Sequence, residues 1–390
     1  MRIGIVAGET SGDYLAAGLI RAIKLRVPDV EVEGIGGVMM AREGARIHYP
    51  MDTISIMGVD GLAESLWKIL KIRRDIYRRF VMNPPDVFVG VDVPDFNLTL
   101  ERKLKRGGIP TIHYVSPTVW AWREYRIHKI RRSVDLMLTL FPFEADYYRE
   151  RHVPVSFVGH PLADEIPETI DREAARTVLG VKAETVVALL PGSRISELKR
   201  LGQLFVDVAV KLCGSGQRDL QFLAPFASQQ TLDYFKDLVV RGASDLPVRL
   251  LEGQSRQVLA ASDMALLASG TAALEAALHK VPMVVTYKVS WFTSLMVRMF
   301  ARVSHFSMPN NLMGKPIVPE LMQGQATAES IYRELTRYLD NEELRRTTEE
   351  TLGGIPRMLR CGANENAAEE VLRVAGRQDI EVASPGHAED

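Results

Sequence analysis

Short apolar runs alternate along the chain with longer segments in which apolar residues recur at helical spacing. The runs are mostly rich in Val, Ile and Leu, which is typical of strands buried on both faces of a sheet. Strands that alternate with helices predict parallel sheets. The predicted strands are residues 3–7, 31–37, 87–91, 111–115, 136–140, 155–158, 186–190, 220–224, 248–251 and 264–268.

This alternation starts again in the middle of the chain, after a stretch rich in charged and turn residues at 161–184. A chain of 390 residues also exceeds the size at which one hydrophobic core usually keeps growing. We therefore predict an α/β protein with two doubly wound, Rossmann-like parallel sheets. The expected domains are 1–165 and 166–375, with the last helices as candidates for packing back on the first domain and 376–390 as a flexible tail.

Composition narrows the class of protein. A hydrophobic content of 46% and a charged content of 25% indicate a globular protein. The net charge of −1 gives no overall attraction to nucleic acid or to an anionic membrane. Cys213 and Cys361 alone form no disulfide framework or zinc site and suit a reducing cytoplasm. We expect no signal peptide, because the chain opens on a predicted strand, and no apolar run approaches the ~20 residues that span a bilayer.

A glycine turn in the second half is the first candidate for ligand chemistry. The strand at 186–190 is followed by Gly192 and Ser193, and Arg194 and Glu197 stand at the start of a predicted helix. Free backbone N–H groups at such a helix start bind phosphate, and an arginine adds a fork of donors. The alternative is an ordinary strand–helix turn with a surface arginine.

A second glycine turn follows the strand at 264–268. Ser269, Gly270 and Thr271 supply backbone and hydroxyl donors, again at a helix start. Glu275 lies four residues after Thr271 on the same helix face, where it could accept both hydroxyls of a ribose. The alternative for Glu275 is a capping or salt-bridged surface residue. Two anion-binding turns in one half together indicate a diphosphate ligand.

Carboxylates follow a strand in the first half as well. Asp92 and Asp95 come after the strand at 87–91, and ligands of open α/β sheets bind at the carboxyl ends of strands. Both are candidates for a general base. The alternative is helix capping, by Asp95 or by Asn97.

Two further turns of the first half are candidates for contact with a second substrate. The turn at 8–13 is rich in glycine but is not a GxGxxG dinucleotide motif, so its glycines are expected to permit close approach of a ligand. The segment 116–122 carries two tryptophans, which can form an apolar wall and can also donate hydrogen bonds through their indole N–H groups.

Residues 54–80 combine an apolar stripe with a basic face, and a second apolar stretch lies at 290–303. A stripe of this kind is typical of a helix that lies on a membrane surface. The alternative is an amphipathic helix that covers a core and has a solvated basic face.

Eight motifs, in order along the chain, resemble those of the lipid-A-disaccharide synthase family. Members of this family are inverting glycosyltransferases with the GT-B architecture, in which two Rossmann-like domains face a central cleft. The motifs are GETSGD (8–13), PDVFVGVDVPDFN (85–97), HYVSPTVWAWR (113–123), FVGHPL (157–162), LLPGSRISE (189–197), LLASGTAALEAAL (266–278), MPNNLMGK (308–315) and VPELMQ (318–323). Two positions depart from the family pattern. Gly61, preceded by Asp60, stands where a Glu is usual, and Asn311 replaces an aliphatic residue.

The resemblance implies that UDP-2,3-diacylglucosamine donates its sugar to 2,3-diacylglucosamine 1-phosphate, which gives a β-1,6-linked disaccharide 1-phosphate and UDP. It implies that Asp95 is the general base, that Arg194 binds the diphosphate and that Asn310 orients the donor. The donor would lie in the second half and the acceptor in the first. The implied donor-binding residues are Gly192, Ser193, Arg194, Glu197, Ser269, Gly270, Thr271 and Glu275, and those on the acceptor side are Ser11, Gly12, Asp13, Asp92, Ser116 and Trp120.

The resemblance also implies a Gram-negative bacterial protein that works at the cytoplasmic face of the inner membrane. The apolar segments 54–80 and 290–303 would then contact the lipid that carries both acylated substrates. No cofactor and no metal are expected, since no DxD-like pair lies on the diphosphate turns. The alternatives are another GT-B enzyme, such as an epimerase or a transferase with a soluble acceptor, and a non-catalytic binding protein. The oligomeric state stays open.

Overall fold

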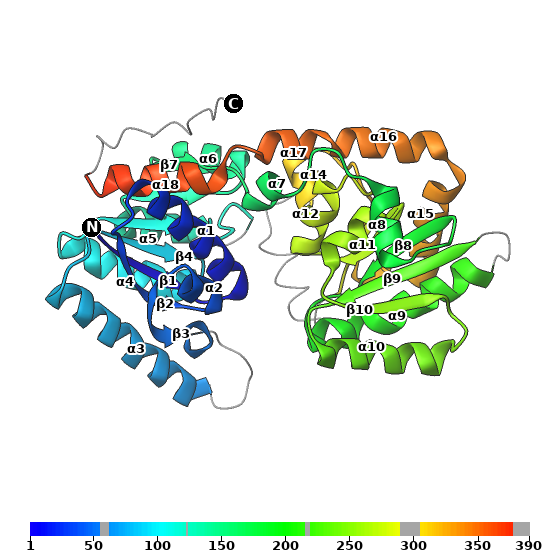
Figure 1. Ribbon diagram of the computed structural model, residues 1–390, viewed down its shortest axis with the longest axis horizontal. Coiled ribbons are helices and arrows are strands. Elements are labelled where there is room, and N and C mark those ends of the chain that lie inside the picture. Colours follow the sequence, from blue (N-terminus) through cyan, green and yellow to red (C-terminus); the bar gives the residue numbers. More distant parts are fainter. Residues whose placement is uncertain (55–61, 122–123, 215–218, 289–304, 377–390) are drawn as a thin grey trace, which may run out of the picture. The chain divides into compact units, whose positions relative to one another are not determined.

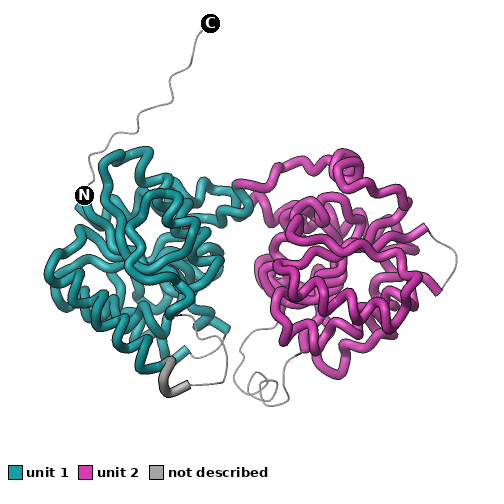
Figure 2. The backbone as a smooth tube through the Cα atoms, turned by 60° about the horizontal axis from the view of Figure 1, so that its bottom comes forward, with its two compact units in different colours: residues 1–164, 359–390 teal, residues 165–358 magenta. Residues whose placement is uncertain are grey.

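The computed structural model describes residues 1–54, 62–121, 124–214, 219–288 and 305–376. These residues form two compact units, shown in Figure 2. Unit 1 comprises Met1–Asp164 and Leu359–Asp390, and unit 2 comprises Glu165–Met358. Unit 2 thus ends before the predicted position 375, because the last helix belongs to unit 1.

Unit 1 contains, among the described residues, a seven-stranded parallel sheet with the order β3-β2-β1-β4-β5-β6-β7. Its strands are β1 (Arg2–Ala7), β2 (Glu31–Gly36), β3 (Arg46–Pro50), β4 (Val87–Val91), β5 (Thr111–Tyr114), β6 (Leu136–Thr139) and β7 (Val155–Phe157). Its helical segments are α1 (Thr10–Arg26), α2 (Val38–Arg42), η1 (Met51–Thr53), α3 (Leu62–Met82), α4 (Pro94–Arg106), η2 (Glu124–Arg126), α5 (Ile127–Ser133), α6 (Pro142–Arg149), α7 (Pro161–Glu165, at the border) and α18 (Ala363–Val374).

Two close contacts fasten helices to this unit. Gly4 of β1 lies under the ring of Phe80 from α3, where a Cβ atom would come within 2.8 Å of the ring. Gly18 of α1 likewise makes room for Asn364 of α18, since a Cβ atom there would come within 2.5 Å of its side chain. Helix α18 therefore packs on α1 at close range, although the two lie at opposite ends of the chain (Figure 1).

Unit 2 contains, in its described part, a six-stranded parallel sheet with the order β10-β9-β8-β11-β12-β13. Its strands are β8 (Thr185–Leu190), β9 (Leu220–Phe226), β10 (Val248–Glu252), β11 (Met264–Ala268), β12 (Met283–Tyr287) and β13 (Glu320–Met322). Its helical segments are α8 (Arg172–Leu179), α9 (Ile195–Gly214), α10 (Gln229–Gly242), α11 (Ser255–Ala261), α12 (Thr271–Leu278), α14 (Met308–Met313), η3 (Gln323–Gln325), α15 (Ala328–Asp340), α16 (Glu342–Leu352) and α17 (Gly354–Leu359).

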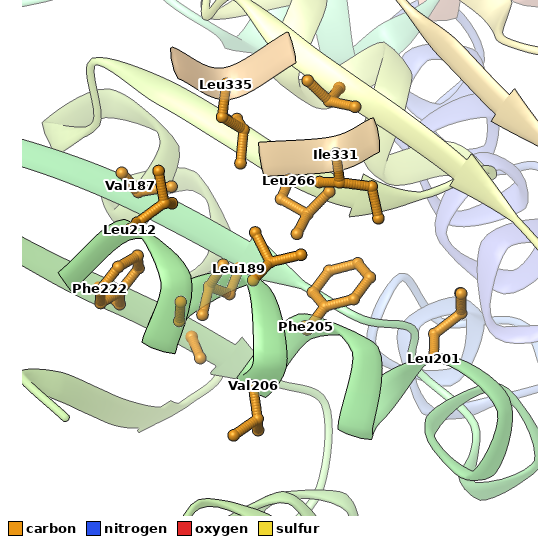
Figure 3. Packing of buried hydrophobic residues seen from close by; sticks show 14 of the residues in the cluster. Val187, Leu189, Leu201, Phe205, Val206, Leu212, Phe222, Leu266, Ile331 and Leu335 are labelled. Atoms are coloured by element: carbon orange, nitrogen blue, oxygen red, sulfur yellow. The ribbon is translucent and has the colours of Figure 1, made fainter. Parts of the chain in front are cut away.

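The core of unit 2 forms between this sheet and two long amphipathic helices (Figure 3). Leu189 and Leu266 from neighbouring strands pack against Phe205 of α9 and Ile331 of α15. All four side chains are at most 1% exposed. Apolar burial of this extent holds the first turn of α9 at a fixed position after β8.

The strand order reverses at the same place in both sheets. In each unit the first strand pairs on one side with the second strand of the unit and on the other side with the fourth, as β1 pairs with β2 and β4 and β8 pairs with β9 and β11. The predicted doubly wound α/β fold is thus confirmed. Ligands of such sheets bind beyond the carboxyl ends of the strands at this switch point.

Candidate active site

The two glycine turns of unit 2 lie side by side at its switch point. They follow the neighbouring parallel strands β8 and β11, in which Leu190, the last residue of β8, is in register with Leu267, the residue before the end of β11. Gly192 has φ 126°, and a Cβ atom there would come within 2.5 Å of Glu197, so the turn requires glycine. Helices α9 and α12 begin directly after the turns. Two helix N-termini therefore meet at one edge, as the sequence predicts for a diphosphate site.

Glu197 occupies the N–H groups of the first turn. Its Oε2 atom accepts hydrogen bonds from the backbone N–H groups of Ser193, at 2.8 Å, and Arg194, at 3.3 Å. The sequence analysis placed Glu197 among the donor-binding residues. The structure instead shows a carboxylate on the N–H groups that a phosphate would use, so Glu197 would have to leave them for a phosphate to bind there. The side chain of Arg194 itself is exposed.

We expect Glu197→Gln to tighten UDP binding by about 3–10-fold, because a neutral amide leaves the N–H groups more easily than a carboxylate and does not repel phosphate. The neighbouring Arg194→Met variant should weaken UDP binding by about 10–100-fold through loss of charged hydrogen bonds. Isothermal titration calorimetry with UDP measures both. Weaker binding by Glu197→Gln would mean that the carboxylate itself supports the bound nucleotide.

The second turn is fixed by its neighbours. Ser269 donates through Oγ to the carbonyl of Phe306 at 3.2 Å, so this hydroxyl is not directed at a ligand. Thr271 is exposed at the first position of α12. Glu275, one turn later, accepts a hydrogen bond from Ser255 Oγ at 3.1 Å, and burial raises the pKa of its carboxyl. Glu275 is therefore anchored on α12 while remaining partly exposed.

Asn310 is fully buried, and its amide is saturated with protein partners. Its Nδ2 group donates to the carbonyl of Val318 at 2.9 Å and to Glu320 Oε1 at 2.8 Å. Its Oδ1 atom accepts from the N–H groups of Ile317 and Val318 at 2.8 and 3.0 Å. No polar atom of this side chain is left for a ligand, so Asn310 can orient a donor only through the residues that it holds in place.

The buried network around Asn310 reaches the second turn indirectly. Glu320 also accepts hydrogen bonds from the N–H groups of Phe306 and Ser307, at 3.0 and 2.8 Å, and from Ser307 Oγ. The carbonyl of Phe306 is the acceptor for Ser269. Asn310 and Glu320 are thus positioning residues for the Ser269 turn.

The switch point of unit 1 has an unusual backbone. Asp92 and Val93 follow β4 with φ values of 53° and 44°, in the left-handed region that β-branched residues such as Val93 rarely adopt. Buried Asn97 holds this loop, since its Nδ2 group lies 2.8 Å from the carbonyl of Asp92 and 3.2 Å from that of Val6. Strain of this kind is typical of functional sites. It sets the direction in which α4 and Asp95 leave the sheet.

Asp95 lies in the first turn of α4 with 78% of its side chain exposed. Its Oδ1 atom forms an ion pair with Arg126 Nη2 at 3.0 Å. Because the carboxylate points into solvent rather than capping the helix, it is available to a substrate. The capping alternative applies to neither residue, since Asn97 bonds to carbonyl groups and the helix has no side-chain cap.

The glycine turn of unit 1 offers a substrate fewer accessible residues than the sequence suggests. Ser11 is exposed, but Gly12 and Asp13 are buried. Asp13 accepts hydrogen bonds from the N–H groups of Gly37, Met39 and Met40, at 2.7–3.2 Å, and thereby holds the start of α2. At 2% exposure Asp13 is a structural residue, and its expected contact with the acceptor needs correction.

Ser116 and Trp120 bind protein partners as well. Trp120 donates through Nε1 to Glu144 at 3.0 Å, and the hydroxyl groups of Ser116 and Tyr148 are 3.0 Å apart. Burial raises the pKa of Glu144 to about 8. Trp120 also meets the ring of Phe143 edge to face at 4.8 Å. Trp120 thus packs against an aromatic ring, and its N–H group and the Ser116 hydroxyl are already bonded within the protein. Trp122, the second tryptophan of the predicted wall, lies outside the described residues.

Helix α3 exposes several large apolar side chains: Leu66 is 48% exposed, Trp67 76% and Leu70 46%. Residues 55–61, which include Gly61, and the whole of the second predicted apolar segment, 290–303, lie outside the described residues. Within the described helices none is long and apolar enough to cross a membrane. The same part of the chain contains no group of three His, Cys, Asp or Glu residues that could hold a metal ion.

The chain is similar to known proteins over almost its whole length. Residues 3–371 match the family model for lipid-A-disaccharide synthetase. The lipid-A-disaccharide synthase of Azotobacter vinelandii is 47% identical over 378 residues, which cover 97% of this chain and 99% of that protein. The chain belongs to the lipid-A-disaccharide synthase family. Another lipid-A-disaccharide synthase, from Alkalilimnicola ehrlichii, is also 47% identical, over 96% of this chain and 99% of its own.

Solved structures confirm the GT-B fold that is expected of a lipid-A-disaccharide synthase. The S. aureus MnaA-UDP co-structure superposes with a TM-score of 0.67 at 12% identity, over 96% of this chain and 97% of that one. A glycosyltransferase of kitacinnamycin superposes with a TM-score of 0.63 at 16% identity, over 96% and 98%. As a member of this family the chain is a glycosyltransferase of lipid A biosynthesis.

Proposed function

We propose that unit 2 binds UDP-2,3-diacylglucosamine and that its sugar is transferred to 2,3-diacylglucosamine 1-phosphate bound by unit 1. The observation that carries the donor assignment is the pair of glycine turns at the switch point of unit 2. Arg194 is exposed beside the first turn, where it can bind the diphosphate as negative charge grows on the leaving UDP. Glu275, on the helix after the second turn, binds the ribose.

Asp95 is the general base of the proposed reaction. The acceptor 6-hydroxyl oxygen attacks the anomeric carbon of the donor, and Asp95 takes the hydroxyl proton. The bond from the anomeric carbon to the diphosphate oxygen breaks, and UDP leaves with the bonding electrons. Attack from the face opposite UDP inverts the anomeric centre and gives the β-1,6 linkage. The exposure of Asp95 at the carboxyl end of β4 supports this role.

The decisive experiment incubates the purified protein with both acylated substrates and follows UDP release and disaccharide formation. We expect both products in equal amounts and neither when the acceptor is omitted. Consumption of the UDP-sugar without acceptor, with formation of an epimer, would favour the epimerase alternative. Binding of both substrates without turnover would favour a non-catalytic binding protein.

We further propose that α3 attaches the protein to the cytoplasmic face of the inner membrane. Its exposed Trp67 and Leu70 are accompanied by exposed Lys68, Lys71 and Arg74 on the same helix. Apolar side chains next to basic ones bind the interface of anionic membranes. Both proposed substrates carry acyl chains, so a protein that rests on the lipid surface meets them where they reside.

The double variant Trp67→Ser, Leu70→Ser should bind phosphatidylglycerol vesicles at least about tenfold more weakly than the wild type, because burial of each large apolar side chain contributes about 1.5–3 kcal/mol. Vesicle sedimentation measures the effect. Leu25→Ser is the matched control, since Leu25 is 79% exposed on α1 of the same unit. Equal losses in both variants would show that α3 has no special part in attachment.

A further inference from the structure

Three cationic side chains from different segments gather at the start of α4. Arg126, from η2, forms the ion pair with Asp95 at 3.0 Å. Arg73, from α3, donates through Nη1 to the carbonyl of Asp95 at 3.4 Å. Lys129, from α5, donates through Nζ to Thr99 Oγ1 at 3.2 Å, one helical turn beyond Asp95. We call Arg73, Arg126 and Lys129 the basic cluster.

The basic cluster carries more positive charge than its contacts neutralise. Asp95 is the one carboxylate in hydrogen-bonding contact with it among the described residues. The buried carboxyl of Glu101 also interacts with Lys129, and burial raises the pKa of Glu101, so an excess of one to two positive charges remains. The side chains are partly buried, and desolvation lowers the pKa of Arg73 and that of Lys129. Asp95 raises the pKa of Lys129 in opposition to burial, Arg126 and Arg73 lower it further, and Glu101 raises it. Partly buried like charges at such close range are unfavourable until an anion joins them.

We propose that the basic cluster binds the phosphate monoester of the acceptor. This inference rests on the proposed function, in which the acceptor is a sugar phosphate and Asp95 is the base. A phosphate monoester carries about −1.5 to −2 charges near neutral pH, which matches the excess charge of the cluster. Guanidinium and ammonium groups are the donors that such phosphates prefer.

The arrangement also fits the shape of the acceptor. A hexose ring separates the attacking hydroxyl from the phosphate, so phosphate ligands must lie near the base but not on it. Lys129 satisfies this condition, because it contacts α4 at Thr99 while Asp95 stands at the first turn. Arg126 can contact both the phosphate and the base, since it is bonded to Asp95 itself.

Binding of the phosphate has a consequence for the base. The phosphate competes with Asp95 for Arg126, so the bound acceptor weakens the ion pair and leaves the carboxylate free to accept the hydroxyl proton. An acceptor that lacks the phosphate leaves Asp95 paired. The cluster thereby couples recognition of the phosphate to activation of the base.

The test measures binding of 2,3-diacylglucosamine 1-phosphate and of its dephosphorylated analogue, both in neutral detergent micelles. We expect Lys129→Met to weaken binding of the phosphorylated acceptor by about 10–100-fold and to leave binding of the analogue, where detectable, unchanged. Lys129→Arg should retain most of the affinity, and the Kd for UDP should not change. Arg132→Met is the matched control, because Arg132 is an exposed cation on the same helix, and it should bind as the wild type does.

Other outcomes overturn the inference. If Lys129→Met weakened the binding of both acceptors equally, or left the affinity for the phosphorylated acceptor unchanged, the basic cluster would have no part in phosphate recognition. Weaker binding to phosphatidylglycerol vesicles with unchanged acceptor affinity in micelles would assign the cluster to lipid headgroups instead. If wild type forms disaccharide from both acceptors with equal kcat/KM, the proposed function stands and the phosphate site fails. If wild type forms no disaccharide from either acceptor, the proposed function itself fails.

Discussion

Asp95→Asn lowers kcat by about 10²–10⁴-fold, the range that a positioned general base contributes. The amide has the size and shape of the carboxylate but cannot take up the hydroxyl proton. Because Asp95 is exposed and holds no backbone group of the helix through its side chain, the fold is expected to stay intact. UDP binds to unit 2 in our proposal, so its Kd should remain that of the wild type. Steady-state kinetics and UDP titration check the two expectations.

The matched control for this variant is Asp146→Asn. Asp146 is also an exposed aspartate on a helix of unit 1, and it is paired with Arg149 at 2.7 Å. Loss of such a surface ion pair changes stability by less than about 1 kcal/mol, and turnover should be unaffected. Full activity of Asp95→Asn would show that Asp95 is not the general base. An equal loss of activity in both variants would indicate a general effect of charge.

Asn310→Ala destabilises unit 2 by about 2–4 kcal/mol, because four buried hydrogen bonds disappear and Glu320 loses a partner. For a unit of this size the midpoint of thermal unfolding should fall by roughly 4–16 °C. Differential scanning calorimetry measures the shift. Turnover should fall as well, since the network holds the segment that contacts Ser269.

The neighbouring residue provides the control. Asn311 donates through Nδ2 to the carbonyls of His305 and Ser307, at 3.1 and 3.0 Å, and is only partly buried. Asn311→Ala should therefore cost less stability than Asn310→Ala. If Asn310→Ala abolished turnover but unfolded at the wild-type temperature, the amide would act directly on substrate and the positioning role would be wrong.

The sequence predicted the fold well wherever a strand is an apolar run. The strands at 87–91, 111–114 and 186–190 are completely buried, so their composition alone marks them. It did not predict β3 (RIHYP) or β13 (ELM), which lie at sheet edges, are only partly buried and carry polar residues. It also missed β12 (MVVTY), because a single apolar run directly after a helix cannot be told from the end of that helix by periodicity.

The sequence predicted where the candidate site residues lie better than it predicted what each residue does. The sequence placed the glycine turns and Asp95 at strand ends, where the structure has them. It could not show that the polar atoms of Asp13 and Asn310 are already hydrogen-bonded within the protein, because their partners lie 24–27 and 7–10 residues away in the sequence. Arg126, Lys129 and Glu320 were missed. The three-residue spacing of Arg126 and Lys129, and the place of Glu320 within the VPELMQ motif, were the available signals.

The contact between Gly18 and Asn364 bears on how the chain acquires its structure during synthesis. Unit 2 is one uninterrupted segment and can fold once residue 358 has left the ribosome. Unit 1 begins earlier but lacks α18 until the final stretch is translated, so the surface of α1 stays uncovered throughout. The half of the protein that is made first is therefore the last to be completed, and a chain that stops between residue 358 and α18 would lack part of unit 1 only.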